Sequence, residues 1–181
     1  MKEKQLKLAA IERSTSKLLR SRCPDIEVNL REGKIRFKKR INFLHNTSTV
    51  ARESRPMLDQ TAFALSLVND IIERDGKLLE LEPLRFEIAG HTHTSRAKAR
   101  NPGTVRLSMS RAKAVMDFMI KEGVKAEYVS CKGYGGTRPL STRPEDNRRV
   151  EITVRNDEFD DLSDDDDDDD DSDENTARVL L

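Results

Sequence analysis

At 181 residues, the chain is long enough for one domain with extensions. Its 33 basic and 33 acidic residues balance, but 14 of the acids and a single base, Arg178, fall within residues 157–181. Residues 1–156 therefore hold 32 basic and 19 acidic residues, a net charge of +13 that favours an anionic partner, and no run of about 18 apolar residues exists that would form a transmembrane helix.

The N-terminus carries no recognisable export signal, because the charged residues 1–5 are followed by no apolar segment. Cys23 follows Arg-Ser-Arg, unlike a bacterial lipidation site, and Cys23 and Cys131 lack the spacing of a disulfide framework. We therefore expect a cytoplasmic, intracellular protein. The alternative is the periplasm or outer membrane, if an upstream export segment is missing from this chain.

Residues 1–25 are predicted to form an N-terminal helix or connector that ends near Cys23-Pro24-Asp25. It would either join a partner or pack on the domain's own sheet. The residues at helical spacing are Leu6, Ala9, Ala10, Ser14 and Leu18 or Leu19.

Alternating residues then predict a hairpin, with strands at 26–30 and 35–37 and a turn at Arg31-Glu32-Gly33. Ser54 is predicted to cap a helix that has Pro56 in its first turn and ends at Gly76. The predicted buried stripe of that helix comprises Leu58, Ala62, Leu65, Val68 or Asn69, and Ile72.

A strand at 84–88 leads to Gly90, a polar loop and a helix that stops at Glu122-Gly123, and further strands follow at 129–133 and 150–154. Five phenylalanines are predicted to lie in the core: Phe37, Phe43, Phe63, Phe86 and Phe118. This alternation predicts an α+β fold, a two-layer sandwich with helices on one face of the sheet, over residues 26–156. The Asp-rich residues 157–181 are predicted to be a disordered acidic tail, which either solubilises the chain or competes for its basic body.

Arg111 belongs to the predicted stripe of the helix after Gly90, together with Leu107, Ala114 and Phe118. A guanidinium that emerges from an apolar stripe must be paired or must reach solvent. Two alternatives follow: a structural arginine that holds the loop through backbone carbonyls, or an arginine that binds a ligand.

Four motifs resemble the C-terminal domain shared by OmpA, MotB and peptidoglycan-associated lipoproteins. They are Gly90-His91-Thr92, Leu107-Ser108-x-x-Arg111-Ala112-x-x-Val115, Gly133-Tyr134-Gly135 and Asn147-Arg148-Arg149-Val150-Glu151-Ile152. The resemblance covers roughly residues 35–156 and implies a β-α-β-α-β-β order with a mixed sheet. In that family the domain binds the diaminopimelate residue of peptidoglycan, whose amine and carboxylate are held by an aspartate after Gly-His-Thr and by the arginine of Leu-Ser-x-x-Arg-Ala.

The arginine carries over onto Arg111, whereas His93 occupies the aspartate position and Thr104 replaces the family's asparagine. An imidazole cannot do for a ligand ammonium what a carboxylate does. The resemblance also places Asn147 and Arg148 beside the ligand loop, so Arg111 and Arg148 would form a pocket that prefers a carboxylate, phosphate or acidic peptide to a zwitterion. The candidate ligand-binding residues are Arg111, Arg148, His93, Thr92 and Asn147.

Two further chemistries are disfavoured. His91 and His93 lie two residues apart, but His45 is the only other histidine and no cysteine or carboxylate stands at ligand spacing, so hydrogen-bonded loop histidines are expected and no metal site. A catalytic triad, a nucleophile elbow and a phosphate loop are all missing, so neither an enzyme nor a cofactor is expected. Arg148 or Arg149 could instead pair with Glu145, Asp146 or Glu151 at the surface.

The sequence thus favours a non-enzymatic binding or scaffold module that recognises an anionic group or a protein partner and not peptidoglycan. The first alternative is a cell-wall anchor that binds peptidoglycan through diaminopimelate. The second is binding of an anionic polymer or nucleic acid by the basic body, although no RNA-binding aromatic motif or helix-turn-helix occurs.

Overall fold

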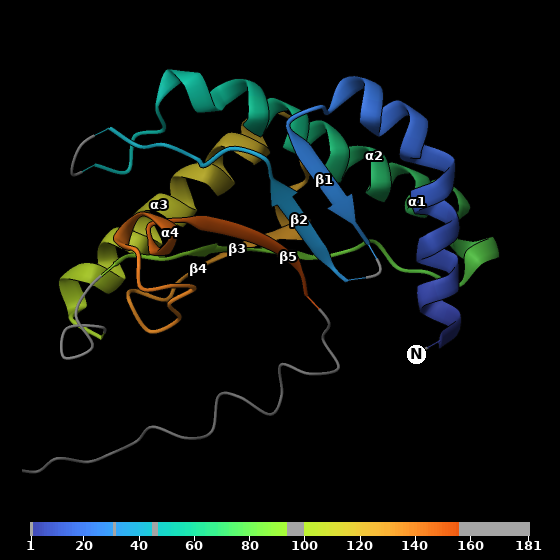
Figure 1. The fold of residues 1–181 in the computed structure, drawn as a ribbon. Coiled ribbons are helices and arrows are strands. Elements are labelled where there is room, and N and C mark those ends of the chain that lie inside the picture. The colour runs from blue at the N-terminus through green and yellow to red at the C-terminus, as the bar shows by residue number, and fades with distance from the viewer. Residues whose placement is uncertain (1, 31, 45–46, 94–99, 156–181) are drawn as a thin grey trace, which may run out of the picture.

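The computed structural model describes residues 2–30, 32–44, 47–93 and 100–155 (Figure 1). Its helices are α1 (Lys2–Arg22), α2 (Arg55–Leu79), α3 (Pro102–Lys121) and the short α4 (Pro144–Asn147), with 3-10 turns η1 (Arg52–Ser54) and η3 (Ala126–Tyr128). Its strands are β1 (Ile26–Asn29), β2 (Lys34–Phe37), β3 (Phe86–Gly90), β4 (Val129–Gly133) and β5 (Val150–Val154). The predicted tail, 157–181, lies outside the described residues.

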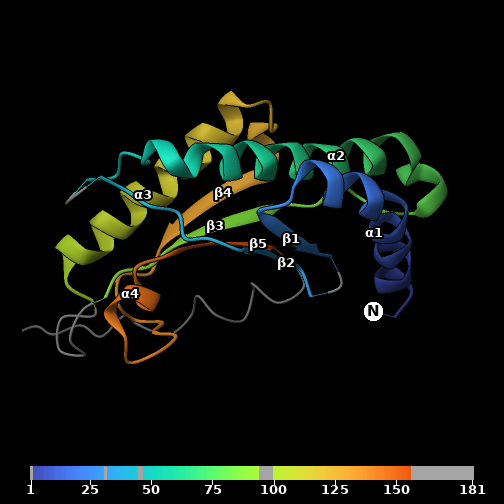
Figure 2. The same ribbon diagram turned by 45° about the horizontal axis from the view of Figure 1, so that its top comes forward.

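The five strands form one sheet in the order β1-β2-β5-β3-β4. Only β3 and β4 are parallel among these neighbours, and the other pairs are antiparallel. Helices α2 and α3 lie over one face of the sheet (Figure 2). The predicted α+β fold, with a mixed sheet and helices on one face, is therefore confirmed.

The core lies between the sheet and these helices. Phe86 and Ile88 alternate along β3 and are at most 1% exposed, and the predicted stripe of α2 from Leu58 to Ile72 is buried throughout. The Asn69 side chain accepts a hydrogen bond from Leu84 N (2.8 Å) and donates one to Leu84 O (2.9 Å). Because this amide occupies the backbone of Leu84, β3 begins at Phe86, two residues later than predicted.

Helix α1 packs on α2 with a face different from the predicted one. Leu8, Ile11, Thr15 and Leu19 are buried, whereas Leu6 is 69% exposed. Of the predicted stripe, Ala9 and Leu19 are buried, whereas Ala10 and Ser14 are exposed like Leu6, so the prediction is correct only in part. The observed face recurs at i, i+3, i+7 and i+11 and buries larger branched side chains than the stripe based on alanine and serine.

Helix α3 is also rotated relative to the prediction. Its buried residues are Ser108, Ala112, Val115 and Met119, one position beyond the predicted set, which is only partly buried. The reason is a close approach to the sheet: a Cβ on Gly133 would lie 2.5 Å from Met109 N. Small residues must face the sheet where backbones come this close.

Two smaller expectations also fail. Helix α2 continues past Gly76 to Leu79, and Glu80 with φ 49° follows its end. An internal glycine costs a helix only about 1 kcal/mol, which the buried stripe of α2 offsets. Of the five phenylalanines only Phe86 is fully buried, and the others pack partly exposed against the core: Phe37, Phe43, Phe63 and Phe118. Among the described residues, no helix has the length and apolar character needed to cross a bilayer.

Candidate functional site

The end of β3 holds together three segments that are distant in sequence. Beyond Gly90, His91 N donates to Arg149 O (2.9 Å) and Thr92 N donates to Gly135 O (2.8 Å). Tyr134 N in turn donates to Gly90 O (2.9 Å). These backbone bonds fix the Gly90-His91-Thr92 segment against the loops that follow β4 and α4.

The first turns of α3 are fastened to the same place. The Ser108 hydroxyl, fully buried, donates to Val105 O (2.8 Å) and accepts from Gly135 N (2.9 Å). The close approach of Gly133 to Met109 adds a second constraint. Because the helix cannot slide along the sheet, the position of Arg111, three residues after Ser108, is also set.

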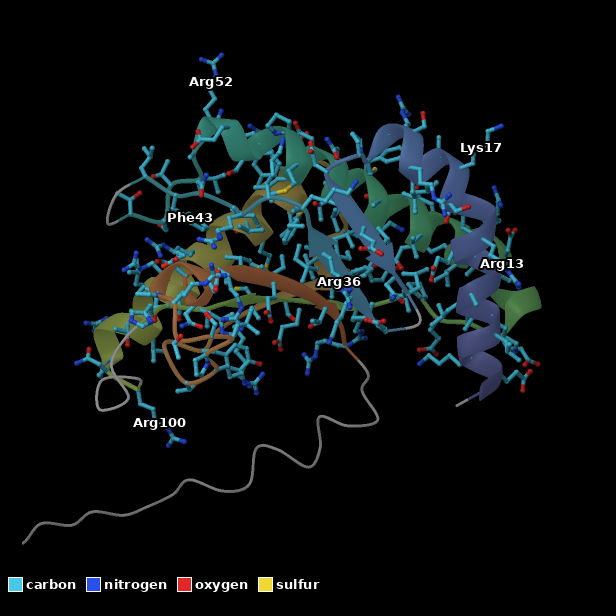
Figure 3. The ribbon with its side chains drawn as sticks, in the orientation of Figure 1. Arg13, Lys17, Arg36, Phe43, Arg52 and Arg100 are labelled. Carbon is cyan, nitrogen blue, oxygen red and sulfur yellow. The ribbon has the colours of Figure 1, made fainter. Side chains whose placement is uncertain are left out.

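Arg111 lies half-buried against the segment that leads to α2, on which Figure 3 labels Phe43. Its Nε–H donates to Thr47 O (3.2 Å), and its guanidinium carbon lies 5.1 Å from the centroid of the Phe43 ring. Burial, and then the charge of Arg148, lower the pKa of Arg111. Arg111 therefore does hold a loop through a backbone carbonyl, as the structural alternative requires. That hydrogen bond uses only the Nε–H, so both terminal nitrogens of Arg111 have no hydrogen bond to a described residue.

Arg148 follows α4 as an exposed residue, close enough for its charge to act on Arg111. Within the described part of the chain, no carboxylate forms an ion pair with Arg111 or Arg148. The neighbouring Arg149 does pair: its Nε lies 2.7 Å from Glu151 Oε1, and both Nη groups donate to Arg138 O at 3.2 Å. The ion-pair alternative thus applies to Arg149, whose side chain is 13% exposed. The charge of Arg148 acts on Arg111, and neither of these two arginines has a described counter-ion.

Thr92 and His91 are buried beside this site, with side chains 7% and 2% exposed. Among the described residues, Thr92 Oγ1 and both ring nitrogens of His91 lack a hydrogen-bond partner. The expectation of a hydrogen-bonded histidine therefore fails for His91, which instead stacks on Tyr134 with ring centroids 5.3 Å apart. Burial, together with Arg149, lowers the pKa of His91 to about 4, so it is neutral at pH 7.

His93, at the family's aspartate position, is exposed. Its Nδ1 lies 3.4 Å from Asn147 Nδ2, a contact in which the amide can donate only if the ring proton sits on Nε2. His91 and His93 do not share a face, since one is buried and the other exposed. In the described ranges, no group of three or more histidine, cysteine or acidic side chains is arranged to hold a metal ion.

Asn147 is 2% exposed and is occupied by its own loop. Its Oδ1 accepts from the backbone N–H groups of Leu140 (2.7 Å) and Ser141 (3.3 Å), and its Nδ2 donates to the carbonyls of Ser141 (2.7 Å) and Arg143 (3.2 Å). The geometry gives Asn147 a positioning role: it shapes the loop that carries Arg148 and lies beside His93. Direct ligand contact by Asn147 stays a prediction.

Two contributors to the site were not anticipated, namely Phe43 and Thr47. Thr47 is 64 positions before Arg111, and its contribution is a backbone carbonyl, which no side-chain pattern reveals. Phe43 was placed in the core because it is aromatic. Only the fold shows that its ring faces a guanidinium.

Comparisons with known proteins agree with this architecture. A sequence model of the OmpA family matches residues 42–153. The chain is 38% identical over 103 residues to photosystem I P700 chlorophyll a apoprotein A2 of Gloeobacter violaceus, an alignment covering 51% of this chain and 11% of that protein. It is 30% identical over 133 residues to outer membrane protein A of Escherichia coli O157:H7, covering 66% of this chain and 34% of that protein.

Among solved structures, an outer membrane protein of Borrelia burgdorferi B31 has a TM-score of 0.50 at 25% identity, over 72% of this chain and 96% of that one. The chain matches about a tenth and about a third of the length of the two curated relatives. Their activities as whole proteins are therefore not transferred to it.

Proposed function

Since the chain belongs to the OmpA family, we propose that it is a non-enzymatic binding module that takes an anionic group, from a ligand or a protein partner, at Arg111 and Arg148. The observation that supports this most is that Arg111 is half-buried with both terminal nitrogens unbonded, that the charge of Arg148 lowers its pKa, and that no described carboxylate pairs with either arginine. Like charges brought together cost free energy unless an anion lies between them. A bound carboxylate would remove that cost.

The donors of Arg111 suit a carboxylate. A guanidinium has five N–H donors in a planar fork, and the Nε–H is taken by Thr47 O. The four N–H groups on the two terminal nitrogens stay available for a ligand. The contact of Arg111 with Phe43 holds the plane of the fork, so little conformational entropy is lost on binding.

The residue at position 93 affects which anionic ligand the site prefers. The family's aspartate would neutralise the ammonium of a zwitterion, whereas imidazole carries no negative charge at any pH. A ligand with carboxylates and no nearby amine therefore fits these residues better than diaminopimelate does. We infer that peptidoglycan is not the preferred ligand.

The test compares two ligands with the same carbon skeleton. Pimelate and meso-diaminopimelate both carry two carboxylates, and only the second carries amines. Isothermal titration of the full chain should give tighter binding of pimelate, lost on Arg111→Ala and kept in Arg106→Ala, a change at an exposed arginine of the same helix. Equal binding of both ligands, or binding that survives Arg111→Ala, would overturn the proposal.

A cell-wall anchor is the second candidate, because Arg111 occupies the position that the family resemblance assigns to ligand binding and Arg148 is expected beside it. Sedimentation with insoluble peptidoglycan tests it directly. Retention that depends on Arg111 and not on Arg106 would establish this candidate and make His93 a tolerated substitution. Absence of retention, in a chain that binds pimelate, would leave the anionic-group module.

A further inference from the structure

The helix-free face of the sheet contains a groove between β2 and β5. These strands pair over only two positions, Lys34 with Thr153 and Ile35 with Ile152, although β2 pairs with β1 along its whole length. Next to this short ladder lies a groove of about 820 Å³, bordered by β2, β5 and the segments after β2 and before α4. Lys34 and Thr153 alternate with the buried isoleucines, so their side chains point to the helix-free face.

The lining is strongly cationic. It includes two acids, Asp146 and Glu151, against six basic residues: Lys34, Arg36, Lys38, Lys39, Arg40 and Arg149. Both acids are already paired with arginines of the groove, each at 2.7–2.8 Å. Arg36 and Lys39 pair with Glu32 and Asp25 outside the lining, so an acidic occupant would meet two cations without a described counter-ion.

Those two cations are Lys34 and Lys38, since neither has an ion-pair partner within the described ranges. The groove also has an apolar part. Leu140, 64% exposed, lines it. An occupant that combines acidic groups with one or two large apolar side chains would match both features.

The chain itself contains such a segment. Residues 157–174 hold 14 acids, and Phe159 and Leu162 stand among the first of them. Arg155 N donates to Arg85 O (2.8 Å), which fixes the point where the chain leaves β5, near the Thr153 end of the groove. The seven residues from Arg155 to Leu162 span up to about 23 Å, and a five-residue strand is only about 17 Å long. The segment is therefore long enough to turn back along the whole groove.

We propose that the groove between β2 and β5 is the docking site of the chain's own acidic segment, residues 157–174. Phe159 and Leu162 contact Leu140, and the aspartates lie against Lys34, Lys38 and their neighbours. This inference is independent of the ligand proposed for Arg111. Its consequence is that an external acidic partner reaches the groove only by displacing the segment, and that salt favours the displacement.

The test uses the full chain with a fluorescent reporter. The sequence has no tryptophan, so Phe159→Trp introduces a single one. Its emission should be blue-shifted, as expected of an indole on an apolar surface. The shift should be lost in Lys34→Glu/Lys38→Glu and at ~1 M salt, where the Debye length falls to about 3 Å.

The matched control is Arg13→Glu/Lys17→Glu, which changes the net charge by the same amount at two exposed residues. Figure 3 shows Arg13 and Lys17 on α1, and Arg36 on β2 at the groove. In the control the blue shift should persist. Equal loss in both double variants would reduce the effect to net charge, and a water-exposed emission in the parent would mean that the groove is empty; either result overturns the proposal.

Zero-length carbodiimide cross-linking gives an independent readout. Tail carboxylates should link to Lys34, Lys38 and Lys39, and not to Lys17 or Lys121. In a mixture of ¹⁴N and ¹⁵N chains, each link should join residues of one isotope. Links of mixed isotope would assign the groove to a second copy of the chain and overturn the intramolecular proposal.

Discussion

The backbone N–H of Gly135 donates a 2.9 Å hydrogen bond to the hydroxyl of Ser108, a residue with no exposed surface. Through this bond, Ser108 on α3 holds the loop after β4. In that loop, the Gly135 carbonyl accepts a hydrogen bond from Thr92 N. The geometry of the candidate site therefore depends on a residue that no ligand touches.

Ser108→Ala should lower the free energy of unfolding by about 1–3 kcal/mol, because it leaves the Gly135 N–H buried without an acceptor. Ser110→Ala is the control, since among the described residues the Ser110 hydroxyl bonds to Leu107 O in the preceding turn and to no other group. Urea denaturation monitored by circular dichroism measures both. Similar losses in the two variants would mean that the Gly135 N–H finds another partner.

Gly133→Ala should destabilise the fold by about 1–3 kcal/mol through overpacking against Met109. The matched substitution is Gly103→Ala, where the one described atom near the new Cβ would be Asn101 Oδ1 at 3.1 Å and where alanine favours the helix. Thermal unfolding should separate the two variants by several degrees. A Gly133→Ala variant as stable as the parent would show that α3 can shift away from β4.

His93→Asp should restore a charge complementary to an ammonium and strengthen diaminopimelate binding by about tenfold, while weakening pimelate binding. His93→Asn, which adds no charge, should do neither. Calorimetric titration with both ligands tests this. No gain for diaminopimelate would mean that the loop has diverged at more than this position.

Acid should destabilise the fold through His91. Its pKa is about 4 in the folded chain against an ordinary 6.5, so between these pH values the unfolded chain binds more protons. The free energy of unfolding should therefore fall as pH decreases from 6.5 towards 4, by on the order of 3 kcal/mol at most.

His91→Phe keeps an aromatic ring beside Tyr134 and removes the titrating group. Urea denaturation from pH 4 to 7 should give a shallower pH dependence for this variant than for the parent. Identical slopes in the parent and His91→Phe would contradict a buried neutral His91.

The sequence predicted the elements well where periodicity is local. Alternation in β5 and the apolar spacing in α2 both depend on residues that face one continuous core, and both predictions hold. The predicted buried face of α3 was wrong because the close approach of Gly133 on β4 decides which residues are buried. Helical periodicity carries no information about that contact. Leu107 and Phe118 look like core residues, yet the backbone approach requires Ser108 and Ala112 to face the sheet.

In the candidate site, too, local sequence patterns were predictive and contacts between distant segments were not. Arg111 was recognised because a motif surrounds it. The two roles considered for it, holding a loop and binding a ligand, both follow from the chemistry of a guanidinium. Its partners Phe43 and Thr47 come from a segment more than 60 positions away, brought near by the path of the chain from β2 to α2. Ligand contact by Asn147 stays a prediction, whereas the four hydrogen bonds that join its buried amide to its own loop are visible only in the fold.

The two-residue ladder between β2 and β5 also affects which part of the sheet unfolds first. Strand β5 pairs with β3 over five positions but with β2 over only two. The hairpin β1–β2 is therefore joined to the rest of the sheet by the shortest strand pairing. Cooperative units of a protein separate where few contacts cross. The hairpin should thus open as a local unit ahead of global unfolding, which would let the groove widen for an occupant while β3, β5 and the arginines beside them keep their places.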